Sequence, residues 1–454
     1  MTAARSEGRR LLVINYHYPP SGAAGGLRWA GLSKYLVRLG WEAHYVTGAV
    51  GAGGPTGVKD GVQIHVCPRR RGMNDLYNAL ARRLRRPRGT ANGGPPHPGV
   101  NGNGASLLGR LRIELATALI FPDPTTRGWV LRAAASARSL VRRLQPDVVV
   151  SSGPPHSAHL VAWLATIGSS ARWFIDLRDP WAGPIATAWY SDPMYRSQLF
   201  RVLTPRLERL AFRAAHGVIA NTPELAAALA AKYPAVAVAC MRNGVDPECL
   251  PPPATRPYPG LGIAYVGTLY GSRDLGPVMQ ALRAFLERRP DAVQAGSKLR
   301  IAGHAEALNA RTRDEEIASL GLEQHVDVLG LLPREQALDV VSRSRLAVVL
   351  AEDWKVQVPA KLYELVAMGV PTLLVAGERG AAAAEAQRLG ATVLDPSDIG
   401  GIVTLLERLW RNEIPQSSPR GAAITHGEMA VVLDQLLTGE FSSNRWPIDP
   451  AVGG

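Results

Sequence analysis

The chain has 454 residues, which is too long for one ordinary hydrophobic core, so its length predicts two domains. A hydrophobic content of 46% indicates a globular protein, and only three cysteines, without paired spacing, argue against a disulfide framework or a zinc site. No apolar run resembles a signal peptide or is long enough to cross a bilayer, so we expect a cytoplasmic protein. The net charge of +13 suggests an anionic partner, which could be phosphates, a membrane surface or nucleic acid.

The first half of the chain alternates short apolar runs with helical patterns, which is typical of an α/β fold. A helical pattern begins near Trp29 and ends at Gly40, another covers residues 107–120, and a third begins with a capping sequence at 221–224. Residues 87–104 are rich in Gly, Pro and Asn, so we expect a disordered segment there. Strands are predicted at 11–14, 42–47, 62–66, 147–150, 173–175 and 217–220.

A proline-rich stretch at 250–260 is the strongest linker signal, and a second series of strands and helices follows it. The sequence therefore predicts two Rossmann-like doubly wound domains that face each other across a cleft. We assign 1–249 to the first domain, 261–424 to the second, and 425–454 to a C-terminal helix and tail, leaving open whether these return to the first domain. The predicted strands are 262–266, 298–301, 326–329, 345–350, 372–375 and 392–394, and the predicted helices 276–289, 334–344, 360–368 and 399–410.

In the first half, polar and glycine residues follow the predicted strands, where ligands bind in such folds. The glycine-rich loop contains Gly22, Gly25 and Gly26, whose backbone N–H groups could approach a phosphate or an acceptor, although a tight structural turn explains the glycines equally well. Candidate acid, base and charge groups come after later strands. They are His156, Asp176, Arg178 and Asp179.

In the second half, Gly267 and Thr268 follow a strand and precede Arg273, which could clamp a diphosphate by paired N–H donors. Lys361 and Glu364 stand at the start of a predicted helix, where the lysine would supply charge for a phosphate and the glutamate an acceptor for a sugar hydroxyl. A surface Lys–Glu pair is the alternative. Further candidates for the same edge are Gly303, Leu331 and Leu362, with Asn243 before the linker.

Taken together, these residues resemble the retaining glycosyltransferases of family 4, which have the GT-B fold. The resemblance covers nearly the whole chain and is carried by 16–20 and 243–246, which look like first-domain signatures, and by 267–273 and 358–364, which look like the donor loop and the donor-site helix. Residues 151–156 and 176–181 resemble a branch seen in surface-polysaccharide and antibiotic pathways.

Three positions depart from the family pattern. The family commonly has two glutamates separated by seven residues; Glu364 fits the second, but Val356 occupies the first. Thr268 replaces the arginine of the donor loop, and Arg273 replaces its lysine. The usual histidine after the fourth strand is replaced by the stretch 176–179.

The resemblance implies transfer of a sugar from a nucleotide-diphosphate-sugar to an acceptor hydroxyl, with retention. UDP-sugar is the expected donor, with GDP- or TDP-sugar as alternatives, and the acceptor is a small molecule or a lipid-linked glycan. Arg273 and Lys361 would bind the diphosphate, Glu364 the ribose, and Asp179 or His156 would orient the acceptor. Because the sequence contains no Asp-x-Asp, we expect no metal and no cofactor. The implied roles are polysaccharide or glycoconjugate biosynthesis and natural-product glycosylation.

Two other functions are weighed against this one. A nucleotide-sugar epimerase on the same fold would bind the donor without transferring the sugar. A basic nucleic-acid-binding protein would explain the charge, but an aromatic content of 6% and the absence of a recognised nucleic-acid module count against it.

The segment 69–88 carries eight arginines against one aspartate, which is +7 of the net charge. Leu76, Leu80 and Leu84 fall on one face of a helix there, and such a basic amphipathic helix could lie at the inner face of the plasma membrane. A solvated helix that packs its leucines on the first domain is the alternative.

Overall fold

The structure is a computed structural model, and its contacts divide the chain into two compact units. Unit 1 consists of residues 1–219 and 235–237, and unit 2 of residues 220–234 and 238–454. The predicted disordered segment, most of the segment 69–88, most of the predicted helix 107–120, and Gly22 lie outside the described residues. The described residues are 8–19, 24–48, 57–69, 113–115, 117–118, 121–123, 126–183, 195, 197–269, 273–303, 307–308, 311–351, 355–377, 379–414 and 423–439.

The first sheet has the strand order β3-β4-β2-β1-β5-β6-β7-β8. Strand β1 pairs in parallel with β2 on one side and β5 on the other, so the direction of strand succession reverses between β1 and β5. Such a reversal opens a ligand crevice at the carboxyl ends of the two strands. The strands are β1 Arg10–Ile14, β2 Glu42–Thr47, β3 Gly57–Lys59, β4 Val62–Val66, β5 Val148–Gly153, β6 Arg172–Leu177, β7 Gly217–Ala220 and β8 Val238–Cys240.

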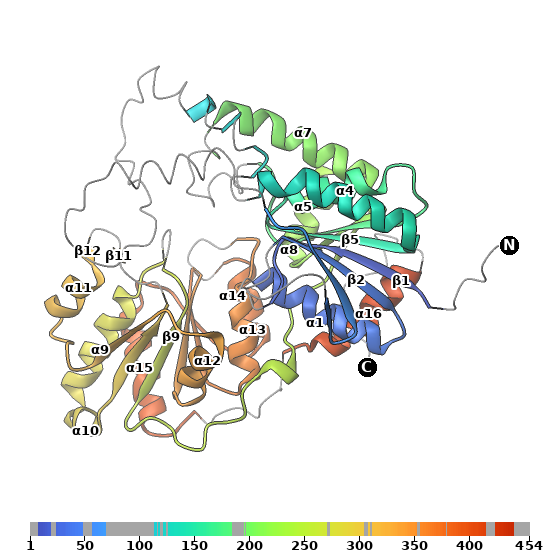
Figure 1. The fold of residues 1–454 in the computed structure, drawn as a ribbon. Helices are drawn as coiled ribbons and strands as arrows, with labels where there is room; N and C mark the ends of the chain where they lie inside the picture. Colours follow the sequence, from blue (N-terminus) through green and yellow to red (C-terminus); the bar gives the residue numbers. More distant parts are fainter. Residues whose placement is uncertain are drawn as a thin grey trace, which may run out of the picture. The chain divides into compact units, whose positions relative to one another are not determined.

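Helices cover both faces of this sheet in unit 1. Helix α1 (Ala24–Arg38) lies on one face, and α4 (Arg127–Leu144), α5 (Ser157–Thr166) and α7 (Gln198–Ala214) lie on the other (Figure 1). Because both faces are covered, the central strands are apolar runs rather than alternating ones. Their core holds three fully buried tryptophans, Trp29, Trp129 and Trp173.

The second sheet is parallel and has the order β13-β10-β9-β14-β15-β16. Its reversal point lies between β9 and β14. A short antiparallel hairpin, β11 (Ala307–Leu308) and β12 (Arg311–Thr312), stands apart from it. The strands of the sheet are β9 Gly262–Val266, β10 Lys298–Ala302, β13 Val326–Gly330, β14 Leu346–Leu350, β15 Thr372–Val375 and β16 Thr392–Leu394.

Two hydrophobic cores flank this second sheet. Helices α9 and α15 supply one core, and α12, α13 and α14 supply the other. This arrangement confirms the predicted α/β class with two doubly wound parallel sheets, apart from the edge strand β3, which is antiparallel to β4. The predicted domain boundaries stay a prediction. The helices of unit 2 are α8 Pro223–Lys232, α9 Gly276–Arg288, α10 Pro290–Gln294, α11 Arg313–Ser319, α12 Arg334–Ser342, α13 Ala360–Ala367, α14 Ala381–Arg388, α15 Ile399–Trp410 and α16 His426–Thr438, with a 3-10 turn at Pro247–Cys249.

Within the described part of the chain, no helix combines the length and the apolar character needed to cross a bilayer.

Candidate functional site

Three glycines bring together the carboxyl ends of neighbouring strands in unit 2. Gly267 and Gly303 directly follow β9 and β10, and Gly330 is the last residue of β13; their φ angles are positive, at 150°, 128° and 67°. The Gly267 amide donates to the Ala302 carbonyl at 2.8 Å, and the Gly303 amide donates to the Gly330 carbonyl at 2.7 Å. The loops that follow the three strands are therefore bonded to one another by main-chain atoms.

Side chains at two of these positions would collide with the site. A Cβ atom on Gly267 would stand 2.0 Å from the Lys361 ammonium, and one on Gly303 would stand 2.2 Å from the Gly267 carbonyl oxygen. Positive φ values of this size also strain any residue with a Cβ. Glycine is thus required at both positions for the strand ends and Lys361 to approach so closely.

Lys361 lies in the first turn of α13, and its ammonium is recessed at the end of β9. The Nζ atom donates to the Val266 carbonyl at 2.8 Å and lies 5.3 Å from the centre of the Tyr265 ring. The pKa of Lys361 is lowered to about 7, mainly by burial and also by the nearby Arg273 guanidinium, while Glu364 acts in the opposite sense. The site thus holds an ammonium that is costly to charge until an anion arrives.

Arg273 is the second cation of this site and is 8% exposed. One terminal nitrogen of its guanidinium donates to the Thr268 carbonyl at 3.1 Å, and the Tyr265 hydroxyl donates to the same oxygen at 3.4 Å. The carboxylate of Glu364 pairs with Arg334 at the start of α12. Arg273 and Lys361 therefore form a cationic pair beside the glycine-lined strand ends.

The other residues of unit 2 that were predicted to bind the donor differ in how far their side chains are exposed. Leu362 is fully buried in the core, whereas the side chain of Leu331 is 70% exposed. Val356, at the position of the family's first glutamate, is buried, and its carbonyl accepts a hydrogen bond from the Thr222 hydroxyl at 2.6 Å. The structure thus brings together Gly267, Thr268, Arg273, Gly303 and Lys361, with Glu364 one turn further along α13.

The loop that contains Asn243 is anchored to the segment before α16. The Val245 amide donates to the Ile424 carbonyl at 3.0 Å. A Cβ atom on Gly244 would stand 2.3 Å from the Met429 sulfur, so the two segments are in close contact. Asn243 itself is buried, and a donor-binding role for it stays a prediction.

In unit 1, Asp176 is held inside the protein. It is fully buried, and its carboxylate accepts hydrogen bonds from Trp29 Nε1 at 2.7 Å, Ser152 Oγ at 2.6 Å and Arg28 Nη2 at 3.4 Å. These contacts tie α1 to the ends of β5 and β6. The geometry favours a positioning role for Asp176, and its predicted catalytic role has no support from these contacts.

Arg178 lies against the first turn of α1. Its Nε donates to Ser152 Oγ at 3.3 Å and its Nη2 to the Pro154 carbonyl. A Cβ atom on Gly25 would stand 2.1 Å from Arg178 Cζ, so the guanidinium occupies the space that a side chain would fill. A guanidinium beside the positive end of a helix favours an anion in the same place.

Three histidines near Arg178 are neutral at pH 7. Burial lowers the pKa of His17 to about 4 and that of His159 to about 3, and Arg178 contributes in both cases. Burial also puts the pKa of His156 well below its usual value. Neutral imidazoles can donate or accept hydrogen bonds without adding charge.

Aromatic stacking fixes the position of His156. Its ring stacks on Trp181 with centroids 5.6 Å apart and an interplanar angle of 17°, and His159 lies 5.2 Å from the same indole. The Nδ1 atom of His159 is 2.9 Å from Ser151 Oγ. Asp179 is half-buried in the loop after β6 and lies between Arg178 and Trp181 in the sequence.

Sequence reasoning missed several residues of both sites. His17 and Trp181 stand inside motifs that carry the family resemblance, so their motifs were a signal that could have found them. Tyr265 lies within the apolar run of β9, so the sequence gives it the pattern of a core residue. Nothing in the sequence links Arg334 with Glu364, although the two side chains form an ion pair.

Part of the chain is similar to a known protein family. The profile of glycosyltransferase family 4 matches residues 91–249. No curated protein matches the sequence.

Solved structures resemble the chain over nearly its whole length. Sucrose-phosphate synthase from Thermosynechococcus elongatus is 13% identical with a TM-score of 0.54, and the match covers 96% of this chain and 95% of that one. The α,α-trehalose 6-phosphate synthase from Burkholderia multivorans is 16% identical with a TM-score of 0.54, and the match covers 94% of each chain. A proposed UDP-N-acetylglucosamine 2-epimerase from Listeria monocytogenes is 13% identical with a TM-score of 0.54, covering 96% and 99%.

At these identities the structures show the fold, which is the GT-B arrangement of two Rossmann-like domains. The match to the glycosyltransferase family 4 profile covers about a third of the chain, and the solved structures share the fold of the whole chain.

The glycine requirement at β10 can be tested by stability measurements. Gly303→Ala should lower the free energy of unfolding by about 2–5 kcal/mol, because backbone strain adds to a clash with a main-chain oxygen. Gly390→Ala is the control: its φ is 76° with nothing within 4 Å of the added Cβ, so strain alone should cost about 1 kcal/mol. Equal losses in chemical unfolding would contradict the proposed close contact.

Proposed function

We propose that this protein transfers a sugar from a nucleotide-diphosphate-sugar to an acceptor hydroxyl, with retention of anomeric configuration and without a metal ion. The observation that carries the proposal is the cationic pair of Arg273 and Lys361 beside the glycine-lined ends of β9 and β10. Closely approaching main-chain groups and two cations suit a diphosphate better than a neutral sugar.

The cationic pair would act on the leaving group. As the bond between the anomeric carbon and the phosphate oxygen breaks, negative charge grows on the diphosphate, and Arg273 and Lys361 stabilise that charge where a metal ion would otherwise do so. The acceptor oxygen bonds to the same face of the anomeric carbon and its proton passes to the departing phosphate oxygen. This scheme needs no carboxylate at position 356, which is valine.

Unit 1 would bind the acceptor. Arg178 and the first turn of α1 favour an acceptor with an anionic or strongly polar group. The neutral His156, stacked on Trp181, can hold a hydroxyl by a hydrogen bond. Asp179 remains a candidate for the same task.

Glu364 would bind the donor ribose only by sharing its carboxylate with Arg334. We propose a UDP-sugar as the donor, with GDP- and TDP-sugars as alternatives, and a small molecule or lipid-linked glycan in polysaccharide or natural-product synthesis as the acceptor. A cytoplasmic location belongs to the same proposal. The epimerase alternative is less favoured because the profile match is to a glycosyltransferase family.

Removing either cation should weaken diphosphate binding. Arg273→Ala and Lys361→Ala should each cost about 1.5–3 kcal/mol of UDP, GDP or TDP binding, which is the range for hydrogen bonds to charged groups. Arg283→Ala is the matched control, because Arg283 is an exposed, ion-paired residue of α9. If calorimetry gives both test variants the parent's affinity for all three nucleotides, Arg273 and Lys361 do not bind the diphosphate.

The low pKa of Lys361 gives nucleotide binding a pH dependence. A bound diphosphate raises the pKa of Lys361 above its value of about 7 in the empty site, so binding takes up a proton at higher pH. Between pH 7.5 and 9, where the diphosphate is fully ionised, the affinity should therefore fall by up to about tenfold per pH unit.

Lys361→Arg is the control for this titration, because arginine stays charged throughout the range and its affinity should change little. The proposed role of Lys361 is wrong if both proteins show the same pH profile.

A further inference from the structure

The helical layer formed by α4, α5 and α7 is strongly basic. Helix α4 contains five arginines and no acidic residue, α5 contains neither, and α7 contains four arginines and one acidic residue, Glu208. Glu208 is buried, so these helices expose no carboxylate. Nine arginines against one glutamate give +8, the greater part of the net charge of +13.

These arginines are not neutralised within the described part of the chain. From Arg132 to the end of α4 and throughout α7, no arginine side chain forms an ion pair with another described residue. The hydrogen bonds that these side chains make go to main-chain carbonyls: Arg132 to Pro68, Arg138 to Leu164 and Ile167, and Arg206 to Val202. The exposed arginines are Arg132, Arg142, Arg143, Arg201, Arg206, Arg209 and Arg213. By contrast, exposed arginines on α9 and α15 of unit 2 pair with glutamates.

Aliphatic side chains accompany the arginines on this layer. Leu131 of α4 is 76% exposed, Ile167 after α5 is 53% exposed, and Val202 and Leu210 of α7 are each 46% exposed. Isolated exposed aliphatic residues are common on soluble proteins, but here they lie in a layer whose described arginines make no ion pair with any residue that the structure describes. Arginine and aliphatic residues together are typical of a surface that rests in a lipid interface.

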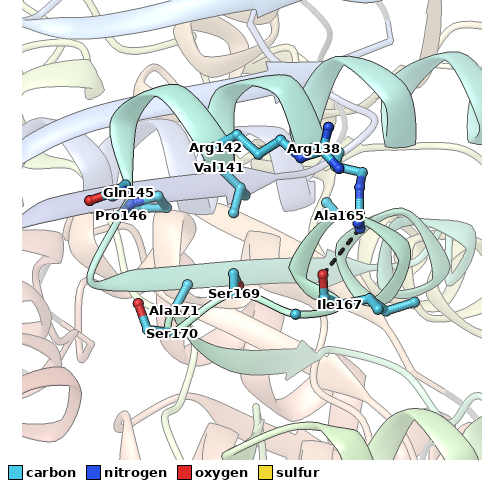
Figure 2. A pocket seen from close by; sticks show the side chains of 11 residues that line it. Arg138, Val141, Arg142, Gln145, Pro146, Ala165, Ile167, Ser169, Ser170 and Ala171 are labelled. Carbon is cyan, nitrogen blue, oxygen red and sulfur yellow. Dashed lines mark hydrogen bonds between the residues drawn. The ribbon is translucent and has the colours of Figure 1, made fainter.

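A cavity of about 390 Å³ lies between the C-terminal parts of α4 and α5. Figure 2 shows Arg138 and Arg142 of α4 above it and Ser169 and Ser170 below. Arg138 reaches across to the Leu164 and Ile167 carbonyls at 3.0 and 3.2 Å. No acidic residue lines the cavity, so it offers guanidinium and hydroxyl groups to an anionic headgroup.

We propose that the face formed by α4, α5 and α7 docks on an anionic lipid surface. The guanidinium groups would pair with lipid phosphates, and Leu131, Ile167, Val202 and Leu210 would enter the interface beside them. Nucleic acid would satisfy the charge but not the exposed aliphatic side chains, because single strands are held by aromatic stacking and duplexes by polar contacts. The residues of this face lie outside the segment 69–88 in the sequence, and the proposal does not depend on the proposed function.

The experiment is co-sedimentation of the whole protein with vesicles of phosphatidylcholine alone or mixed with phosphatidylglycerol. The test variant changes Arg201, Arg206, Arg209 and Arg213 to glutamine. The control variant changes Arg283, Arg288, Arg408 and Arg411 to glutamine, so both variants lose four arginine charges, the test variant on α7 and the control variant at ion-paired positions of unit 2. Thermal unfolding checks that both remain folded.

We expect the parent and the control to bind the anionic vesicles and not the neutral ones. The test variant should lose about three orders of magnitude in partition coefficient, because each of its four removed arginines would add to binding near an anionic surface. The double variant Leu131→Ser and Ile167→Ser should bind the anionic vesicles more weakly than the parent, and this difference should persist at high salt because it comes from apolar contacts.

Three outcomes would overturn the proposal. In the first, the test and control variants lose binding equally, which would indicate net charge alone. In the second, binding survives in the test variant but is lost when the five arginines between 82 and 88 become glutamine, which would place the contact in that segment. In the third, duplex DNA binds more tightly than the anionic vesicles and competes with them.

Discussion

The contact between the Lys361 ammonium and the Val266 carbonyl is the constraint on which the site in unit 2 depends. It requires that Gly267 has no side chain, and the position of Gly267 in turn requires glycine at 303. The result is a recessed lysine next to a buried arginine, an arrangement that like-charge repulsion and loss of hydration make costly in the empty protein. An anion between the two cations would remove that cost, which is why we propose that a diphosphate binds at this site.

A main-chain contact holds the segment before α13 at Val356, where the family pattern has its first glutamate. The Val356 carbonyl accepts a hydrogen bond from the Thr222 hydroxyl, and the same oxygen of Thr222 accepts the Leu225 amide as the cap of α8. The segment before the helix that carries Lys361 and Glu364 is thus joined to the start of α8, and the apolar side chain of residue 356 is buried.

Much of the fold could be predicted, because buried parallel strands are continuous apolar runs. Strands β9, β14 and β15 appear in the sequence as such runs, and Gly369 marks the end of α13. Helices α4, α5, α7, α10, α11 and α14 were not predicted. Helix α5 is apolar on most sides and α14 is a run of alanines, so packing in the tertiary structure decides what periodicity leaves open there. Helices α4 and α7 have one buried and one arginine-rich side, a signal that could have found them.

The sites were less predictable than the fold, because their contacts join distant residues. Nothing in the sequence brings Lys361 to Val266 or Arg334 to Glu364. Strand β6 extends to Leu177, two residues beyond the predicted end, so Asp176 belongs to the strand and points into the core while Arg178 follows it. Residue type and order alone cannot separate these two roles.

The most direct test of the account is an experimental structure of the protein with UDP in the presence of Mg²⁺. The account predicts that the diphosphate lies within hydrogen-bond distance of the Arg273 guanidinium and the Lys361 ammonium, with no metal ion between the phosphates and a carboxylate. A nucleotide bound elsewhere, or a diphosphate held to the protein through Mg²⁺, would contradict it.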